Sequence, residues 1–156
     1  MTPPLHYIAG FFDGEGSIGV YRDGRGRHHL RTQLAQNVTP VSSSLFESFK
    51  HRWGGNLSLD HNRKGSCFNW QLNSSTAVRF LMDIHPYLIL KKEQALLALM
   101  WQGGRPKAER NEKGHFVTVR DPIDEKVATM LKRLKAEDVP SDELRQLKVD
   151  LHNWSA

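Results

Sequence analysis

An apolar helical run that ends in a carboxylate between two glycines is the strongest constraint on this chain. Residues 8 to 16 read Ile-Ala-Gly-Phe-Phe-Asp-Gly-Glu-Gly, so Glu15 lies between Gly14 and Gly16. Gly10 and Gly14 are four residues apart and share one helix face. A glycine inside a helix costs about 1 kcal/mol relative to alanine, so the pair indicates either close packing against another backbone or an ordinary glycine stop. The pattern predicts a metal-binding acid at a helix end, with the simple stop as the alternative.

The basic charge of the chain is concentrated in its first 120 residues. Lys and Arg outnumber Asp and Glu by 16 to 9 in residues 1–120, whereas residues 121–156 hold 6 bases and 8 acids. A basic surface attracts polyanions such as nucleic acid, although many proteins carry this much charge without such a partner. A chain of 156 residues has room for one domain, which we expect to span residues 1–156 with a core at about 5–102 and a helical extension at about 116–156.

Several other classes of protein are excluded by composition. Cys67 is the only cysteine, so an internal disulfide and a cysteine-based zinc cluster within one chain are impossible. The eight histidines show no metal-ligand spacing. No apolar run approaches the length of a membrane span, and no secretory signal is evident at the N-terminus. We therefore expect a soluble intracellular protein without a membrane partner, in a bacterial or phage-infected cytoplasm or in an organelle.

Apolar periodicity and turn residues predict helices and hairpins in a fixed order. We expect a helix that ends near residue 16, strands at 17–22 and 30–38, a helix at 42–53, strands at 57–61 and 67–72, and helices at 76–84, 91–101, 123–135 and 141–154. A serine cluster is available to cap the helix at 42–53. The order helix, hairpin, helix, hairpin, helix is an α+β arrangement, αββαββα, in which helices cover one face of an antiparallel sheet and further helices follow at the C-terminus.

Alternation along these strands predicts one apolar and one polar face. Leu30, Leu34, Val38, Leu57, Leu59, Phe68, Trp70 and Leu72 are expected to point inward. The expected outward residues are Ser17, Tyr21, Arg31, Gln33, Ala35, Asn37, Asn56, Ser58, Asn69 and Gln71. Arg, Gln and Asn match base edges in the major groove, which accepts a two-stranded ribbon. The alternative is the solvated polar face that every exposed antiparallel sheet has.

Charged residues at the two hairpin tips extend this pattern. Arg25 and Arg27 in the first turn, and Arg63 and Lys64 in the second, are suited to DNA phosphates. Asp23 and Asp60 share the outward positions and repel phosphate, so at an interface we expect them to face cytosine edges or water. The sheet is thus predicted to bind double-stranded DNA.

Residues 8–16 resemble the nine-residue motif for which the LAGLIDADG homing endonucleases are named, with Ile8, Phe11, Phe12, Gly14 and Glu15 as variants. The strand at 17–21, the segment 38–39 and the run 85–95 also follow the order and spacing of that family. The resemblance covers roughly residues 5–102 and fades beyond them. It implies a saddle-shaped sheet that sits in the DNA major groove.

The resemblance also implies an activity and its residues. It implies a homodimeric, sequence-specific endonuclease that cleaves both strands of a long, roughly palindromic site with Mg²⁺, for which Mn²⁺ or Ca²⁺ can substitute in the site, and that serves intron homing. Glu15 matches the metal-binding acid, the Gly14 carbonyl matches the second oxygen ligand, and Lys91 matches a basic residue near the scissile phosphate, with Lys92 as its neighbour and substitute. Asp13 matches an acid with a structural role.

One carboxylate per chain is too few for such a site, so two motif helices must meet. We expect Ala9, Gly10, Phe11 and Gly14 to face the second copy. Two departures from the family are Glu15 in place of the more common Asp, and Pro40 where a water-positioning glutamine is expected; Gln36, Asn37 or a solvent network could replace that glutamine. These departures leave an alternative function open, namely a cleavage-inactive DNA-binding protein or an intron RNA maturase on the same fold.

Overall fold

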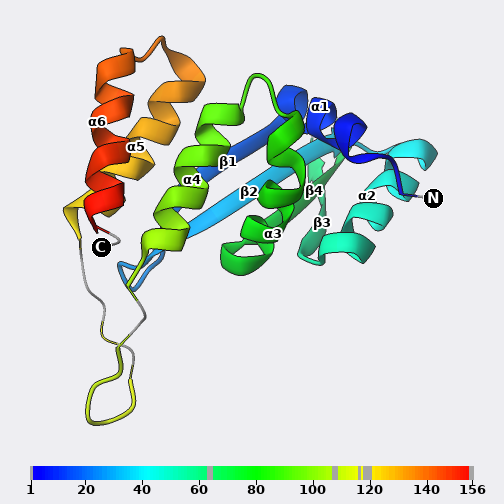
Figure 1. The fold of residues 1–156 in the computed structure, drawn as a ribbon. Coiled ribbons are helices and arrows are strands. Elements are labelled where there is room, and N and C mark those ends of the chain that lie inside the picture. The colour runs from blue at the N-terminus through cyan, green and yellow to red at the C-terminus, as the bar shows by residue number, and fades with distance from the viewer. Residues whose placement is uncertain (1, 63–64, 107–108, 116, 118–120, 155–156) are drawn as a thin grey trace.

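The computed structural model describes residues 2–62, 65–106, 109–115, 117 and 121–154. Its elements, shown in Figure 1, are α1 (Leu5–Glu15), β1 (Gly16–Arg22), β2 (His28–Asn37), α2 (Pro40–Trp53), β3 (Asn56–Asn62), β4 (Gly65–Asn73), α3 (Ser74–Ile84), the 3-10 turn η1 (His85–Tyr87), α4 (Lys92–Gly104), α5 (Pro122–Ala136) and α6 (Ser141–Trp154). The predicted α+β class and the αββαββα order are confirmed. None of the helices in the described ranges has the length and apolar character needed to cross a bilayer.

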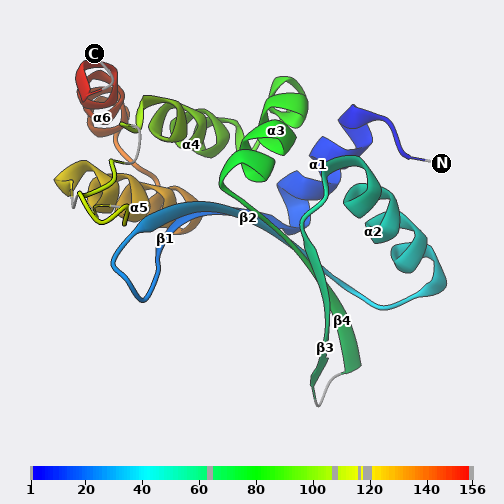
Figure 2. The ribbon, with the colours of Figure 1, turned by 90° about the horizontal axis from the view of Figure 1, so that it is seen from below.

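The four strands form one antiparallel sheet in the order β1-β2-β4-β3. The two hairpins are joined at its centre by β2 and β4, where Gln33 pairs with Gln71. Figure 2 shows all helices on one side of this strongly twisted sheet, while the two hairpins diverge on the other side and leave a curved face uncovered. The saddle-shaped sheet expected from the resemblance is therefore present.

Aromatic side chains from four elements form the centre of the core. The Phe80 ring on α3 makes edge contacts with Phe12 on α1, Trp53 on α2 and Trp70 on β4, with centroid distances of 5.1, 5.1 and 5.2 Å. Both indole N–H groups are satisfied: Trp53 donates to an Asp83 carboxylate oxygen at 2.8 Å, and Trp70 donates to a backbone carbonyl at 2.9 Å. Burial of these rings fixes the motif helix against the sheet and its neighbouring helices.

Helix α2 begins at Pro40, two residues before the expected start. Thr39 is the N-cap: its hydroxyl accepts the Ser42 backbone N–H at 3.0 Å, and the Ser42 hydroxyl accepts the Thr39 backbone N–H at 2.8 Å. Proline fits the first helical position because that position needs no N–H. The serine cluster thus supplies one half of a capping box, and the cap itself is the threonine.

Two side chains that were expected to point into the core are exposed. Val38 is 37% exposed and Leu59 is 47% exposed. Val38 follows the end of β2, and Leu59 lies on the edge strand β3, whose hairpin extends beyond the helical layer (Figure 2). Alternation sets which side of a strand a residue faces, but burial requires an element to cover that side.

The aromatic core yields a stability prediction. Phe80→Ala should lower the free energy of unfolding by about 3–5 kcal/mol, because it removes three ring contacts and leaves a cavity among α1, α2 and β4. Chemical denaturation monitored by tryptophan fluorescence measures the loss. Val41→Ala is the control, since Val41 is 78% exposed and should change stability by less than about 0.5 kcal/mol. A loss below about 1 kcal/mol for Phe80→Ala would contradict a central role of this ring.

Candidate nucleic-acid interface and metal centre

The strand register aligns polar side chains in rows across the uncovered sheet face. Ser17 pairs with Gln33, Gln33 with Gln71, and Gln71 with Asn56, so one row crosses all four strands. Residues of opposite parity at the centre of the sheet, such as Leu34 and Leu72, are buried beneath the helices. Three neighbouring amide side chains in register provide both donors and acceptors, which is the chemistry that base edges require.

Two further rows continue this surface. Ala35 pairs with Asn69, which pairs with Ser58. Gly19 pairs with Arg31, whose Nε donates to the Asn73 carbonyl oxygen at 3.3 Å. The structure thus gathers on one face the outward residues expected from alternation, including Asn37, which pairs with Cys67 at the end of β2. Asn73 belongs to the same face and was missed because it ends its strand.

Arg31 and Tyr21 are arranged by a contact between them. The Arg31 guanidinium carbon lies 4.8 Å from the centroid of the Tyr21 ring, a cation–π distance. Gly19 permits this arrangement, since a Cβ at that position would come within 2.6 Å of a Tyr21 ring carbon. The guanidinium is therefore held on the open face in a preferred orientation.

The first hairpin tip is organised by Asp23. One carboxylate oxygen accepts the backbone N–H groups of Arg25 and Arg27, both at 2.9 Å, and the other bonds His29 Nε2 at 2.9 Å and Arg27 Nε at 3.1 Å. The hydrogen bond with His29, followed by that from the Arg27 backbone, lowers the pKa of Asp23 far below its usual value. This carboxylate is thus used within the turn, and its facing cytosine or water at an interface stays a prediction.

Of the basic residues at the two hairpin tips, only those of the first tip are described. Arg25 is exposed, and no carboxylate of the described residues lies within salt-bridge distance of it, whereas Arg27 is partly neutralised by Asp23. Arg63 and Lys64 of the second tip lie outside the described residues. Arg25 is thus the basic side chain at the first tip that is best suited to a phosphate.

Glu15 and Gly14 form the exposed end of α1. The helix ends with the Gly16 N–H bonded to the Phe12 carbonyl, and among the described residues no donor reaches the Gly14 carbonyl. The Glu15 carboxylate is exposed, and no described cation lies within 4.0 Å of it. An unsatisfied carbonyl beside an unpaired carboxylate is an oxygen donor set that fits a hard divalent cation.

A single chain does not complete such a site. Nowhere in the described ranges do three or more His, Cys, Asp or Glu side chains converge on a point that could hold a metal ion. Gly14 and Glu15 supply two oxygen ligands, whereas Mg²⁺ prefers six. Water, substrate oxygens or a second chain would supply the further ligands.

Asp13, the other acid of the motif, is buried and structural. Its carboxylate accepts three backbone N–H groups, from Ile89 at 2.7 Å, Leu90 at 3.2 Å and Lys91 at 2.9 Å. Asp13 is 8% exposed, so these bonds compensate the burial of its charge. This carboxylate therefore joins the end of α1 to the segment before α4.

Lys91 lies at the same helix end as Glu15. It is the N-cap residue of α4, and its Nζ donates to the Asp13 backbone carbonyl, which belongs to the last turn of α1. Partial burial lowers the pKa of Lys91, while the negative charges of Asp13 and Glu15 act in the opposite direction. Lys92 is exposed and makes none of these contacts. The structure thus brings Glu15 and Lys91 together from positions 76 residues apart in the sequence.

The four residues expected to face a second copy differ in exposure. Gly10 and Gly14 are exposed, and a Cβ at either position would meet no atom of the described residues within 4 Å. Phe11 is partly buried against Phe46 and Phe49, each with a centroid distance of 6.4 Å. The prediction for Ala9 is wrong, because its side chain is fully buried where α1 contacts its own core.

Exposed apolar side chains surround these glycines and were missed in the sequence. Tyr7 is 51% exposed, Ile89 82% and Leu90 75%. Tyr7 precedes Gly10 by three residues, so helical spacing alone could have placed it on the glycine face. Ile89 and Leu90 are brought there by their backbone bonds to Asp13, which local spacing does not reveal.

The structure also locates Pro40, which stands where a water-positioning glutamine was expected, and the two residues proposed to replace that glutamine. Pro40 is exposed at the first turn of α2 and has no side-chain hydrogen-bonding group. Gln36 has the parity of the helix-covered face, and its side-chain oxygen accepts the Asn37 backbone N–H at 2.9 Å. Of the two candidates to replace the missing glutamine, Asn37 is the one on the open face.

Comparison with known proteins gives one sequence relative. The intron-encoded RNA maturase bI4 of Saccharomyces cerevisiae is 31% identical to this chain over 74 residues, which are 47% of this chain and 11% of the maturase. The chain thus corresponds to a small part of that protein. No protein-family model matches the chain.

Solved structures show the same fold over nearly the whole chain. The homing endonuclease I-CvuI, in complex with its target in the presence of calcium, superposes with a TM-score of 0.59 at 17% identity, covering 95% of this chain and 94% of that chain. The archaeal intron-encoded homing endonuclease I-Vdi141I, complexed with DNA, gives a TM-score of 0.57 at 18% identity, covering 96% and 95%. This chain has the fold of the LAGLIDADG homing endonucleases, as the sequence resemblance predicted.

The two acids of the motif should respond differently to mutation. Asp13→Ala should lower the free energy of unfolding by about 2–4 kcal/mol, because it leaves three backbone N–H groups of residues 89–91 without their acceptor. Glu15→Gln should change it by less than about 0.5 kcal/mol, since Glu15 is exposed and makes no contact that stabilises the fold. Urea denaturation of both variants measures the difference, and equal losses would contradict this division of roles.

Proposed function

We propose that this protein is a homodimeric, sequence-specific DNA endonuclease that hydrolyses phosphodiester bonds with a divalent cation, Mg²⁺ first. The observation that carries the proposal is the pairing of an open, acid-poor sheet face with an exposed carboxylate and a lysine at the end of α1. Both solved neighbours described above are homing endonucleases in complexes with DNA. Intron homing is the biological role that this activity would serve.

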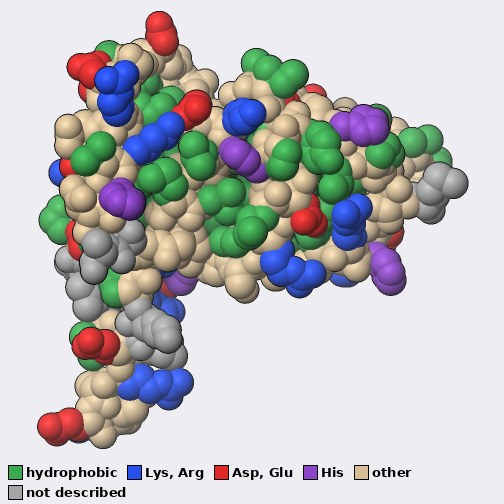
Figure 3. Space-filling view, in the orientation of Figure 1, with side chains coloured by type: hydrophobic (Ala, Val, Ile, Leu, Met, Phe, Trp, Pro, Cys, Tyr) green, Lys and Arg blue, Asp and Glu red, His purple; other side chains and the backbone are tan. Residues whose placement is uncertain are grey.

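The sheet face is proposed to read the major groove. The row from Ser17 through Gln33 and Gln71 to Asn56 presents amides and a hydroxyl to base edges, and Arg31 is oriented by Tyr21. Arg25 at the hairpin tip is suited to a phosphate. On the helix-covered side, hydrophobic side chains gather over α3 and α4 among scattered charged ones (Figure 3).

Two copies are proposed to meet along α1. Gly10 and Gly14 lower the helical propensity without relieving any contact within the chain, so their benefit must come from another molecule. Tyr7, Ile89 and Leu90 add exposed apolar surface around them. An isologous contact would bring two Glu15 carboxylates to the two-fold axis and give a palindromic preference.

Each residue at the helix end has a proposed role in hydrolysis. Glu15 and the Gly14 carbonyl would hold Mg²⁺, which when bound supplies charge neutralisation and an activated water. The Lys91 ammonium stabilises negative charge that develops on the phosphate, and its partial burial strengthens that interaction because less water screens it. Asp13 positions Lys91 through the backbone and takes no part in the chemistry.

A second candidate function is supported by the match to a maturase. The 74 residues shared with maturase bI4, at 31% identity, favour assistance of intron RNA splicing as the alternative, and Pro40 supplies no side chain to position a water. A splicing function would not depend on Glu15. The maturase function would be favoured if the protein cleaves no DNA and if Glu15→Ala still promotes splicing of a host intron transcript.

Cleavage of a randomised DNA library with Mg²⁺ tests the leading proposal. Wild-type protein should cut a subset of sequences, and Glu15→Gln should reduce the cleavage rate by about 10²-fold or more, because one proposed ligand loses its charge at both sites of the dimer. Glu47→Gln is the matched control, since Glu47 is an exposed acid on α2, away from the helix end. The proposal would be contradicted if the wild-type protein cleaved no sequence, or if Glu15→Gln and Glu47→Gln cleaved DNA at equal rates.

Solution mass tests the dimer. Gly10→Leu should leave the fold intact, because Gly10 is exposed and a Cβ there meets no described atom within 4 Å, yet it should shift the protein towards monomer and abolish cleavage. Gly103→Leu is the matched control: Gly103 also lies in a helix, and a Cβ there meets no atom within 4 Å. A wild-type protein that stays monomeric with and without DNA would remove the proposed active site.

A further inference from the structure

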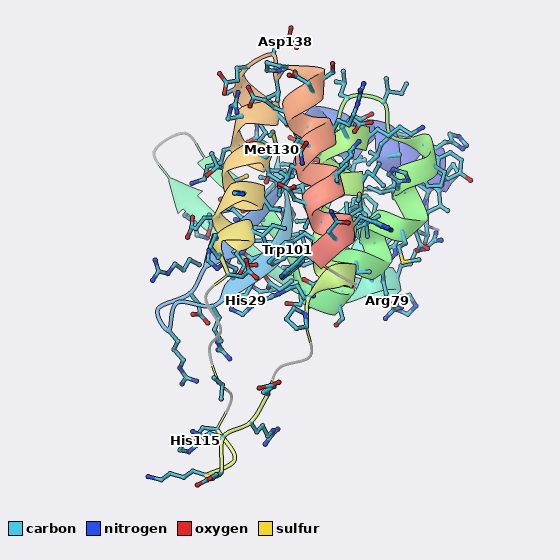
Figure 4. The ribbon with its side chains drawn as sticks, turned by 60° about the vertical axis from the view of Figure 1, so that its left-hand side comes forward. His29, Arg79, Trp101, His115, Met130 and Asp138 are labelled. Carbon is cyan, nitrogen blue, oxygen red and sulfur yellow. The ribbon has the colours of Figure 1, made fainter. Side chains whose placement is uncertain are left out.

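Helix α5, the first of the two helices that follow the core, runs back towards the Glu15 end of α1. Near its start, Glu125 Oε1 bonds His28 Nε2 at 2.9 Å, and Asp124 Oδ1 accepts the Trp101 indole N–H at 2.9 Å. Between its ends α5 packs along β1. Figure 4 shows this direction, with His29 beside the start of α5 and Asp138 just beyond its far end. The last turn of α5 therefore lies at the end of the molecule where β1 begins, directly after Glu15.

Contacts with α4 place this last turn beside Lys91. The Gln94 side-chain amide donates to the Leu134 carbonyl at 3.5 Å, which joins the first turn of α4 to the last turn of α5. Lys135 follows Leu134, and Lys91 is the N-cap residue of α4. Partial burial, then repulsion from Lys91 and from Lys132, lowers the pKa of Lys135. The two ammonium groups are thus electrostatic neighbours although they are 44 residues apart in the sequence.

Three acids near the end of α5 and the start of α4 are already paired with other cations. Glu137 and Glu143 both bind Arg133, with N···O distances of 2.6 Å, and Glu93 binds Lys148. Among the described residues, no carboxylate lies within 4.0 Å of Lys135. Lysine is favourable at a helix C-terminus, which explains one positive charge there but not its placement against a second lysine. Asp13 and Glu15 attract Lys91, whereas no described carboxylate balances the charge of Lys135, so this end of the molecule can accept a further anion.

We propose that Lys135, on the C-terminal helix α5, joins Lys91 in binding a DNA backbone phosphate at the Glu15 end of α1. The inference rests on the proposed nuclease function and assigns the C-terminal helices a part in it. A phosphodiester is the anion that the proposed substrate carries to this point, and the ammonium groups at two adjoining helix ends supply a donor for each of its two unbridged oxygens. Lys135 acts as a phosphate-binding residue, while Glu15 and Lys91 remain the groups at the reacting atoms.

The test compares Lys135→Gln with Lys126→Gln in the full-length dimer. Lys126 is the matched control, because it is an exposed lysine on the same helix, near the His28 end. Lys135→Gln should slow single-turnover cleavage about tenfold or more. It should also reduce the slope of log binding constant against log salt by about two, one phosphate contact for each subunit. Lys135→Arg should restore most of both, and Lys126→Gln should change neither.

Thermal stability separates this role from a structural one. Removing a positive charge that is repelled by Lys91 and Lys132 should leave the midpoint of unfolding unchanged or slightly higher. A lower midpoint for Lys135→Gln with an unaltered salt slope would overturn the proposal in favour of packing. If the wild-type protein cleaves DNA and Lys135→Gln cleaves it equally fast, only the proposed role of Lys135 is overturned. If the wild-type protein cuts no DNA, the proposed function is overturned, and this inference with it.

Discussion

The Asp13 carboxylate holds together the two segments on which the candidate site depends. It accepts the backbone N–H groups of Ile89, Leu90 and Lys91, and the Lys91 ammonium donates back to the Asp13 carbonyl. The Asp13 side chain thus binds N–H groups just before α4, which have no helical partner there. In return, the Lys91 side chain binds a carbonyl in the last turn of α1, which also has no helical partner. Without this exchange, neither Lys91 nor the apolar pair Ile89 and Leu90 would be held beside α1.

Two acids of the motif, Asp13 and Glu15, have different roles although they are only two residues apart. Asp13 points inward and is used by the fold, whereas Glu15, two positions on and therefore on another side of the helix, remains exposed and unpaired. The aromatic core around Phe80 fixes which side of α1 faces inward. A stable scaffold can thus carry at its surface a carboxylate that makes no hydrogen bond or salt bridge with the described residues and is free to bind a cation.

The two faces of the sheet are likewise divided between a structural role and a binding role. One face is covered by α1, α2, α3, α4 and α5, and the opposite face is left open because no helix crosses it (Figure 2). The β2–β4 pairing brings the two hairpins into one register, so that polar residues far apart in the chain form continuous rows. The C-terminal helices extend the helical layer along β1 and carry Lys132 and Lys135 to the end of the sheet that adjoins Glu15.

Local pattern was sufficient for much of this protein. Strand alternation predicted the polar face from Ser17 to Gln71, helical spacing predicted the Gly10 and Gly14 pair, and the motif resemblance predicted the fold and the contrast between Asp13 and Glu15. These features depend on residues close in sequence, or on a shared order of elements, and both can be read without coordinates.

Only the tertiary structure decided which of these features meet and which are covered. It buried Ala9, exposed Leu59, and paired Asp23 with His29 and Arg27 within its turn. It also brought Lys135 beside Lys91 through the packing of α5 on α4. Burial and long-range electrostatic contact depend on which elements cover one another, and a one-dimensional period carries no information about that.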